Sequence, residues 1–409
     1  MRAIITPSQA KGHVLAPPSK SMAHRMLMGA GLSEGTSVIR NIELSEDIKA
    51  TLGILKALGC SYEMQEKAVT IRGIGGRDIF SDLPLDCKES GSTLRFFIPL
   101  LLVSGKKARF TGASRLLERP LGIYEEICEE QGISFSKGEN TLVVEGRLQA
   151  TKYQVKGNIS SQFITGLLFA LPLLLGDSVL EVLPPVESKA YIEMSLEALA
   201  FYGIQIRREE NTYYIAGGQR YQARDAAVEG DYSNAAFLEA LNCLGGEVVV
   251  EGLREDSLQG DRVYREHLLT LEQTHPHICL SECPDLGPIL MGMAAAKNGA
   301  VFTGTERLKI KESDRGAVMA EELKKFGISV DVRDNEIVVY RGRLQAPTEL
   351  LDGHNDHRIV MTLATLCSVT GGTIVGCEAV KKSFPSYFDV IKELGIDVKL
   401  EDESRRTEK

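Results

Sequence analysis

The segment Pro18–Arg25 places hydroxyl groups and two cations where a helix is expected to begin, with Ser19 or Ser21 as its N-cap. Backbone N–H groups at a helix start are unpaired and the helix dipole is positive there, so this position favours anions. Lys20 and Arg25 add charge within the first turns. The segment therefore predicts a site for an anionic ligand, although an ordinary capped surface helix would read the same way in isolation.

A second charged segment, Lys309–Arg315, holds two lysines, two carboxylates and an arginine. A solvated helix face is one interpretation. The other is catalytic, because Glu312 stands beside Lys311 and near Arg315, and neighbouring cations adjust a carboxyl pKa for acid or base work. Asp285 precedes an apolar run, so it is either a helix N-cap or, if it faces the same cations, the base for a hydroxyl group.

Metal and nucleotide sites are not indicated. Two groups have metal-ligating residue types: His354, Asp356 and His357, and then His275, His277, Cys279 and Cys283. The first group fits no common zinc spacing and has Arg358 in the same turn, while the alternation of the second suits a strand. Neither a phosphate-binding Gly-x-x-x-x-Gly-Lys-Ser/Thr loop nor a Gly-x-Gly-x-x-Gly fingerprint is present.

The elements that position these residues form a repeat. A polar cluster, a nearly continuous apolar run and a glycine recur after Pro18–Arg25 at residues 89–95, 158–162, 230–234, 283–285 and 353–358. Each run is followed by a strand-like stretch, a charged turn, an amphipathic helix and another strand. The strand-like stretches begin near Ser37, Ala108, Ser178, Glu247, Ala300 and Gly372, at spacings of 71, 70, 69, 53 and 72 residues. Six copies of one βα unit explain this pattern.

Alternating strand and helix signals indicate an α/β protein with two domains of three units each. We place units one to three in residues 15–228, and units four to six in residues 1–14 and 229–409. The first helix of each unit is apolar nearly all round and should be buried, whereas the second is amphipathic and should face solvent. Five of the amphipathic helices should end at Leu58-Gly59, Gln131-Gly132, Tyr202-Gly203, Phe326-Gly327 and Leu394-Gly395.

The composition excludes several classes of protein. A chain of 409 residues with 43% apolar residues is long enough for two cores. A net charge of −9 disfavours a general nucleic-acid binder, although a locally positive cleft remains compatible with it. The eight cysteines show no paired framework, and the longest apolar runs, 96–103 and 166–175, are too short to span a membrane. We expect a soluble, cytoplasmic protein with reduced thiols.

Eight motifs in this chain resemble, in order, those of the 5-enolpyruvylshikimate-3-phosphate (EPSP) synthase family, from Lys20 to Phe384. They are Pro-Ser-Lys-Ser with Arg25, Ser-Gly-Ser-Thr-x-Arg, Arg-x-x-x-Arg-Pro, Ser-Ser-Gln, Pro-Asp, Lys-x-Lys-Glu-Ser-Asp-Arg, Asn-Asp-His-Arg and Lys-Ser-Phe-Pro. The resemblance implies two domains, each of three βαβαββ repeats around a pseudo-threefold axis (an inside-out α/β barrel). It also implies an active site in the cleft between the domains.

The implied reaction transfers the enolpyruvyl group of phosphoenolpyruvate to the 5-hydroxyl of shikimate 3-phosphate and releases phosphate. It proceeds by addition and elimination through a tetrahedral intermediate, in the shikimate pathway of aromatic amino acid biosynthesis. The resemblance implies no metal or organic cofactor. We expect a monomer whose partners are these two small molecules, without nucleic acid or membrane.

The resemblance also assigns roles to matching positions. Asp285 would take the 5-hydroxyl proton, Glu312 would take part in proton transfer to the methylene carbon, and Lys20 would be the third catalytic residue. Shikimate 3-phosphate would be bound by Lys20, Ser21, Arg25, Ser160, Ser161, Gln162, Ser188, Asp285 and Lys311. Phosphoenolpyruvate would be bound by Lys20, Gly91, Arg119, Gln162, Arg315, Arg358 and Lys382.

Three positions depart from the family pattern. Lys88-Glu89 stands where Gly-Asn is frequent, Ser92 where Thr is usual, and Gly316 where an aliphatic residue is common. The first two lie beside the expected phosphoenolpyruvate site, so the motif leaves the sensitivity to glyphosate-like inhibitors open.

Three other functions fit parts of the sequence. The enolpyruvyl transferase acting on UDP-N-acetylglucosamine has Lys-Asn where Lys20-Ser21 stand and a Cys before its Arg-Pro, whereas residues 112–118 here contain none. RNA 3′-phosphate cyclases use related repeats but need a nucleic-acid surface, which the net charge disfavours. A repeat scaffold binding an anionic partner explains the repeats but not the cations expected beside Asp285 and Glu312.

Overall fold

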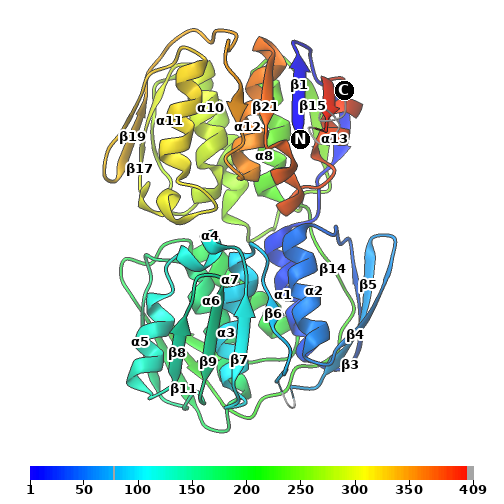
Figure 1. The fold of residues 1–409 in the computed structure, drawn as a ribbon, viewed down its shortest axis with the longest axis vertical. Coiled ribbons are helices and arrows are strands. Elements are labelled where there is room, and N and C mark those ends of the chain that lie inside the picture. Colours follow the sequence, from blue (N-terminus) through cyan, green and yellow to red (C-terminus); the bar gives the residue numbers. More distant parts are fainter. Residues whose placement is uncertain (77–78, 403–409) are drawn as a thin grey trace. The chain divides into compact units, whose positions relative to one another are not determined.

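The computed structural model describes residues 1–76 and 79–402. The chain forms two compact units, one of residues 18–229 and the other of residues 1–17 and 230 onward (Figure 1). Strand β2 (Lys11–Leu15) pairs in parallel with β15 (Glu247–Glu251), and for this reason the boundary lies after Pro17, three residues beyond the expected position. Within the described residues, no helix has the length and apolar character needed to cross a membrane.

The unit of residues 18–229 contains three repeats of one topology. The first comprises α1 (Lys20–Leu32), β3 (Glu34–Arg40), α2 (Glu46–Ala57), β4 (Ser61–Gln65), β5 (Ala68–Ile74) and, from the end of the unit, β14 (Ala226–Ala227). The second comprises β6 (Leu85–Asp86), α3 (Gly91–Leu102), β7 (Ala108–Thr111), α4 (Ser114–Glu118), α5 (Gly122–Glu130), β8 (Ser134–Lys137) and β9 (Thr141–Glu145). The third comprises β10 (Lys152–Lys156), α6 (Ser161–Ala170), β11 (Ser178–Leu183), α7 (Lys189–Phe201), β12 (Ile206–Glu209) and β13 (Thr212–Ile215).

Each of these repeats forms a four-stranded sheet with one parallel pair and two antiparallel pairs. The strand orders are β14-β3-β5-β4, β6-β7-β9-β8 and β10-β11-β13-β12. In the third sheet, for example, β10 pairs in parallel with β11, which pairs antiparallel with β13, the partner of β12. The repetition inferred from the polar clusters is therefore a repetition of sheet topology.

The other unit repeats this plan with two variations. Its elements are β1 (Arg2–Thr6), β2, α8 (Tyr232–Cys243), β15, α9 (Tyr264–Gln273), β16 (His277–Cys279), α10 (Gly287–Ala296), β17 (Ala300–Thr303), α11 (Arg315–Lys325), β18 (Val330–Val332), β19 (Glu336–Val339), β20 (Leu351–Asp352), α12 (His357–Thr370), β21 (Gly372–Val375), α13 (Tyr387–Glu393) and β22 (Asp397–Glu401). The sheet of the fourth repeat has only β2 and β15, which explains the short spacing of 53 residues in the sequence. The sixth sheet, β20-β21-β1-β22, takes one antiparallel strand from the N-terminus.

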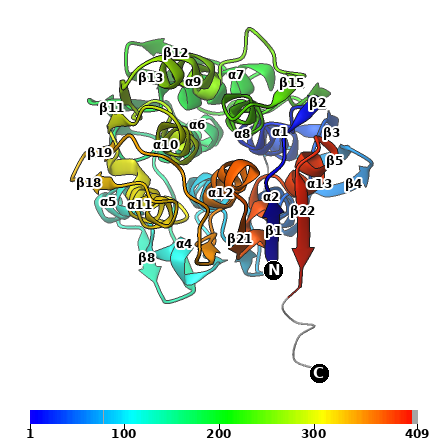
Figure 2. The ribbon, with the colours of Figure 1, turned by 90° about the horizontal axis from the view of Figure 1, so that it is seen from above.

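The first helix of every repeat is buried, as its sequence predicts. Leu27, Phe97 and Leu167 in α1, α3 and α6 are fully inaccessible to solvent, and so are most apolar side chains of α8, α10 and α12. Figure 2 looks nearly along α8, α10 and α12, which lie side by side inside their unit. Their axes run roughly alike, so these helices present their N-terminal residues on one side of the unit.

Local capping sets the ends of these helices. Ser19, Ser90 and Ser160 accept hydrogen bonds from backbone N–H groups at the starts of α1, α3 and α6. The five predicted Gly ends are also confirmed: Gly59, Gly132, Gly203, Gly327 and Gly395 all have positive φ, between 65° and 102°. A left-handed residue after the helix is readily formed by glycine, which has no Cβ.

Candidate active site

Asp285 is the centre of an ion-pair cluster in the unit of residues 230 onward. It lies in a single 3₁₀ turn before α10, and its side chain does not cap that helix. Its Oδ1 accepts from Lys311 Nζ at 3.1 Å and from Arg315 Nη1 at 2.8 Å, while Oδ2 lies 3.3 Å from Arg358 Nη2. Burial by itself would raise the pKa of Asp285, but Arg358, Lys311 and Arg315 outweigh it and hold this pKa well below its usual range.

Arg315, the first residue of α11, joins three carboxylates. Besides Asp285 it binds Glu312 Oε2 through Nη2 at 2.7 Å and Asp356 Oδ2 through Nε at 2.8 Å. Its side chain is only 1% exposed, so these pairs lie in a low-dielectric environment where charge-assisted hydrogen bonds are strong. Asp314 accepts from the N–H of Ala317 and fixes the start of the helix.

Asp356 connects the starts of α11 and α12, a role that the sequence did not predict. This fully buried carboxylate caps α12 by accepting from the Arg358 N–H at 2.9 Å, and it also accepts from Ser313 Oγ at 3.0 Å and from Arg315. The neighbouring Asn355 carbonyl accepts from Lys382 Nζ. The charged groups of Arg315 and Lys382 and the backbone N–H of Arg358 therefore all bind one short turn.

Lys311 is mostly buried beside these groups, with 17% of its side chain exposed. Burial lowers its pKa to about 8, opposed by the attraction of Asp285 and assisted by repulsion from Arg307 and Arg315. A lysine with a pKa near neutrality can change its charge in the working pH range.

In the unit of residues 18–229, the two cations of the first motif extend to different neighbours. Lys20 begins α1, and its Nζ binds Asp47 Oδ2 of α2 at 2.7 Å. Arg25 is 3% exposed and donates to Ser195 Oγ, Tyr191 O and other oxygens of α1, α6 and α7. Burial lowers the pKa of Arg25 to about 10. The side chains of Lys20 and Arg25 therefore contact two different sets of neighbours.

The second and third motifs of this unit meet at the starts of α3 and α6. Gln162 accepts from Arg95 Nη1 at 2.7 Å and donates to Ser92 Oγ at 2.9 Å. The guanidinium of Arg119 packs against Gly91, where an added Cβ would lie 2.7 Å from Nη1. No role was predicted for Arg95, although it is the last residue of the Ser-Gly-Ser-Thr-x-Arg motif.

The serines predicted to contact the acceptor lie either at the N-cap of a helix, as Ser160 and Ser188 do, or in the first turn of a helix, as Ser21 and Ser161 do. Ser160 is the N-cap of α6 and accepts from the Gln162 N–H at 3.3 Å, while Ser161 is the first residue of that helix and is buried. Ser188 precedes α7 with a φ of 52° and no measurable exposure. Ser21 offers its carbonyl to Arg25 Nη1 at 2.7 Å.

Two of the residues considered as metal ligands, His354 and Asp356, are engaged in ion pairs. His354 Nε2 binds Glu322 Oε1 at 2.9 Å, whereas Asp356 binds Arg315. Glu321, Glu322 and His354 do bring ligand atoms within 4.8 Å of one another. However, Lys325 Nζ lies 2.7 Å from Glu322, so an ammonium group already neutralises this carboxylate.

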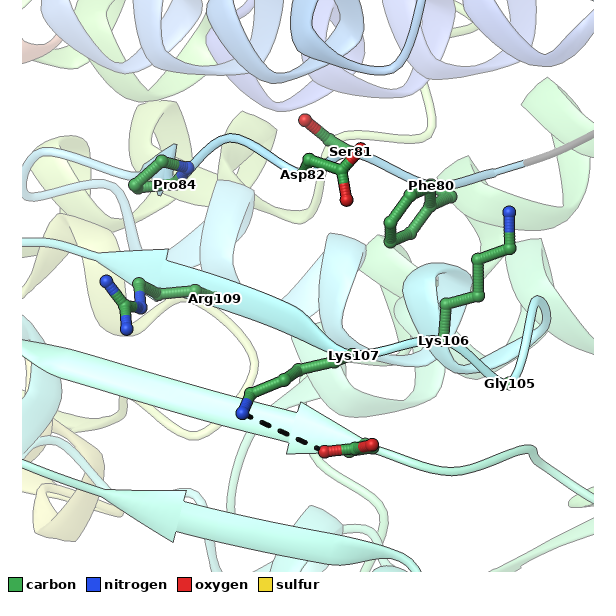
Figure 3. A pocket seen from close by; sticks show the side chains of 9 residues that line it. Phe80, Ser81, Asp82, Pro84, Gly105, Lys106, Lys107 and Arg109 are labelled. Carbon is green, nitrogen blue, oxygen red and sulfur yellow. Dashed lines mark ion pairs between the residues drawn. The ribbon is translucent and has the colours of Figure 1, made fainter.

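A cavity of about 500 Å³ in the unit of residues 18–229 is separate from these groups. It is lined by Phe80, Ser81, Asp82, Pro84, Gly105, Lys106, Lys107, Arg109 and Glu145 (Figure 3). Lys106 lies over the Phe80 ring at 4.3 Å, and Lys107 faces Glu145 across 4.0 Å. None of the predicted site residues lines it.

Comparison with known proteins agrees with the motifs. The family model described as EPSP synthase (3-phosphoshikimate 1-carboxyvinyltransferase) matches residues 4–391. Proteins named 3-phosphoshikimate 1-carboxyvinyltransferase from Clostridium kluyveri and Clostridium novyi are 37% and 39% identical, over 96% of this chain and 97% of each relative. A protein of the same name from Clostridioides difficile is 38% identical with the same coverage.

The predicted fold class is also confirmed. An EPSP synthase structure from Acinetobacter baumannii superposes with a TM-score of 0.79, at 24% identity, over 98% of this chain and 100% of that one. A second structure of that protein gives a TM-score of 0.78. Since the family model spans nearly the whole chain and curated relatives of that name exceed 30% identity, the chain belongs to the EPSP synthase (3-phosphoshikimate 1-carboxyvinyltransferase) family.

Proposed function

We propose that this protein transfers the enolpyruvyl group of phosphoenolpyruvate to the 5-hydroxyl of shikimate 3-phosphate and releases phosphate, a step of aromatic amino acid biosynthesis. The observation that carries the proposal is the cluster in which Asp285 meets Lys311, Arg315 and Arg358, in a chain of this family. We further propose that it is a monomer and that it is cytoplasmic; its eight free cysteines support the second of these proposals.

The charges of the site suit two polyanionic substrates. Phosphoenolpyruvate carries a carboxylate and a phosphate, and fixed arginines bind such groups with orientation as well as charge. We assign donor binding to Lys20, Gly91, Arg119, Gln162, Arg315, Arg358 and Lys382. We assign acceptor binding to Lys20, Ser21, Arg25, Ser160, Ser161, Gln162, Ser188, Asp285 and Lys311.

The reaction needs an acid and a base at one centre. The 5-hydroxyl oxygen adds to carbon 2 of phosphoenolpyruvate as Asp285 removes its proton, and the methylene carbon gains a proton to become a methyl group. The tetrahedral intermediate then loses phosphate, and one methyl proton is removed to form the enol ether. We assign the proton transfer at that carbon to Glu312, which binds Nη2 of Arg315 while Asp285 binds Nη1.

The ion pairs of Asp285 couple substrate binding to its basicity. In the free protein its low pKa guarantees an ionised carboxylate at neutral pH, but a strongly stabilised carboxylate is a weak base. When Lys311 and Arg358 also bind substrate anions, they stabilise the carboxylate of Asp285 less, and the pKa of Asp285 rises. Asp285 then becomes a stronger base when substrate is present.

Phosphate release from phosphoenolpyruvate tests the function directly. The purified protein is assayed with shikimate 3-phosphate or with UDP-N-acetylglucosamine as acceptor. We expect release with shikimate 3-phosphate alone. Release only with the sugar nucleotide would reassign the acceptor within the same chemistry, and no release with either would contradict the enzymatic proposal.

Alanine at Gly91 is expected to raise KM for phosphoenolpyruvate about tenfold with little loss of stability. The added Cβ would lie 2.7 Å from Arg119 Nη1 and 3.0 Å from its Cζ, so the flexible end of that side chain must shift. The measurement is KM for each substrate together with the thermal unfolding midpoint.

The matched control is Gly122→Ala, since an added Cβ at Gly122 meets no atom within 4 Å. Equal KM values for Gly91→Ala and the unsubstituted protein would show that Arg119 in this position does not bind the donor.

The pKa of Lys311 predicts an alkaline limit to activity. This lysine is protonated below its pKa of about 8 and neutral above it, so kcat/KM for shikimate 3-phosphate should fall as pH rises through about 8. In Lys311→Arg the side chain stays charged, and the fall should move to higher pH. Lys309→Arg, which changes an exposed lysine of the same segment, is the control. An unchanged profile in Lys311→Arg would assign the limit to another group.

A further inference from the structure

The turn Asp352–Asp356, between β20 and α12, holds three cations that we assign to donor binding. Its Asn355 carbonyl accepts from Lys382, and its Asp356 carboxylate binds Arg315 and caps the helix that carries Arg358. His354 and Asn355 have φ values of 46° and 51°. Non-glycine residues rarely adopt this left-handed region, although histidine and asparagine do so more often than most, and contacts from outside the turn help to hold two of them in succession.

Glu322, on α11, supplies these contacts. Its fully buried carboxylate accepts from the Asp352 N–H at 3.1 Å and lies 2.9 Å from His354 Nε2. Lys325 Nζ, one turn later on the helix, binds the same carboxylate at 2.7 Å and donates to the Leu350 carbonyl at 3.1 Å. One carboxylate therefore fixes the backbone at the start of the turn and the side chain of a strained residue within it.

We propose that Glu322 is a positioning residue for the donor substrate, acting through the turn Asp352–Asp356 on Lys382, Arg315 and Arg358. The inference rests on the proposed function, because it takes these cations as the donor site. Glu322 itself touches none of them, and helix α11 transmits its position: Arg315 begins this helix, and Glu322 lies two turns further along it.

Loss of the Glu322 charge should affect the binding of the two substrates differently. Without the Glu322 charge, His354 and Asn355 can relax toward ordinary backbone conformations, and the Asn355 carbonyl and the Asp356 carboxylate lose their fixed positions. Donor binding then weakens. Ser160, Ser161 and Gln162, which we assign to the acceptor, belong to the other compact unit, so most of the acceptor binding should be retained.

Glu322→Gln keeps the shape of the side chain and removes its charge. We expect KM for phosphoenolpyruvate to rise about tenfold, which corresponds to about 1.4 kcal/mol of binding, with kcat and KM for shikimate 3-phosphate within about twofold. Amide hydrogen exchange of the peptide covering residues 352–356 should accelerate in parallel.

Glu321→Gln is the matched control. Glu321 is the exposed neighbour of Glu322, and its carboxylate lies within 4.8 Å of the same ligand atoms, so this substitution removes a similar charge without removing the hydrogen bonds to the turn. It should leave both KM values and the exchange rate unchanged. If Glu322→Gln does not fold, His354→Ala removes one of the same contacts from a side chain that is 21% exposed, and KM for phosphoenolpyruvate should rise about threefold.

Three outcomes would overturn the inference. The first is an unchanged KM for phosphoenolpyruvate in the Glu322 and His354 variants. The second is an equal rise of KM for phosphoenolpyruvate and for shikimate 3-phosphate. The third is a lower unfolding temperature with unchanged kinetics. These differ from failure of the proposed function, which would appear as absence of phosphate release in the unsubstituted protein.

Discussion

Replacement of Asp285 by asparagine is expected to lower kcat about 10³-fold while both KM values change by less than about threefold. Asparagine retains the size of the side chain and can still accept from Lys311 and Arg315, but it cannot take the hydroxyl proton. Lys311, Arg315 and Arg358 also lose the negative charge of Asp285, and this loss favours the binding of polyanionic substrates. Binding therefore persists while the chemical step fails.

Steady-state kinetics with phosphoenolpyruvate and shikimate 3-phosphate give this result directly. Glu282→Gln, at an exposed carboxylate three positions earlier, is the control and should retain full activity. A kcat for Asp285→Asn within about tenfold of the unsubstituted value would remove Asp285 from the role of base.

Replacement of Arg315 by methionine is expected to destabilise its unit by about 3–5 kcal/mol. The guanidinium is 1% exposed and binds the carboxylates of Asp285, Glu312 and Asp356. Asp356 is affected most, because it has no exposure and Arg315 is its partner through two nitrogens, at 2.8 and 3.3 Å. A buried carboxylate that loses its counter-ion retains the desolvation penalty without the compensating attraction.

Calorimetric unfolding of the whole chain measures this loss as a lower midpoint of one transition, since a chain with two compact units need not unfold in a single step. Combining Arg315→Met with Asp356→Asn should recover about 1–3 kcal/mol, because the second substitution removes the uncompensated charge. Lys324→Met, at an exposed position of the same helix, should change stability by less than about 0.5 kcal/mol. Strict additivity of the two substitutions would show that the ion pair is not the source of the loss.

The sequence determined the features that depend on a few neighbouring residues. Ser19 and Ser90 cap helices because a hydroxyl needs only the N–H three positions later, and Gly59 ends a helix because its own φ is positive. The apolar helices and the strand-like stretches recur at fixed spacings for the same reason. Local rules were thus sufficient for the repeats, the α/β class and the family motifs.

For residues that interact across repeats, the sequence suggested that they belong to the proposed site but did not show which of them form ion pairs with one another. The local sequence favoured Asp285 as a helix cap, yet its carboxylate binds Arg315, 30 positions away, and Arg358. Helical periodicity places Glu322 on the face of Met319 and Phe326 and Glu321 outside it, but periodicity does not show which groups the Glu322 carboxylate binds.

Tertiary structure decides these cases because the energy of a charged group depends on its burial and on the charges that the fold brings to it. Lys20 and Arg25 lie five residues apart on the same helix, but Asp47 attracts one while the oxygens around Ser195 hold the other. Likewise, only pairing across the sheet makes the N-terminal strand β1 the neighbour of both β21 and β22. The sequence alone could therefore nominate charged groups for the proposed site, while their ion pairs, their pKa values and the contacts of the Asp352–Asp356 turn follow from the fold.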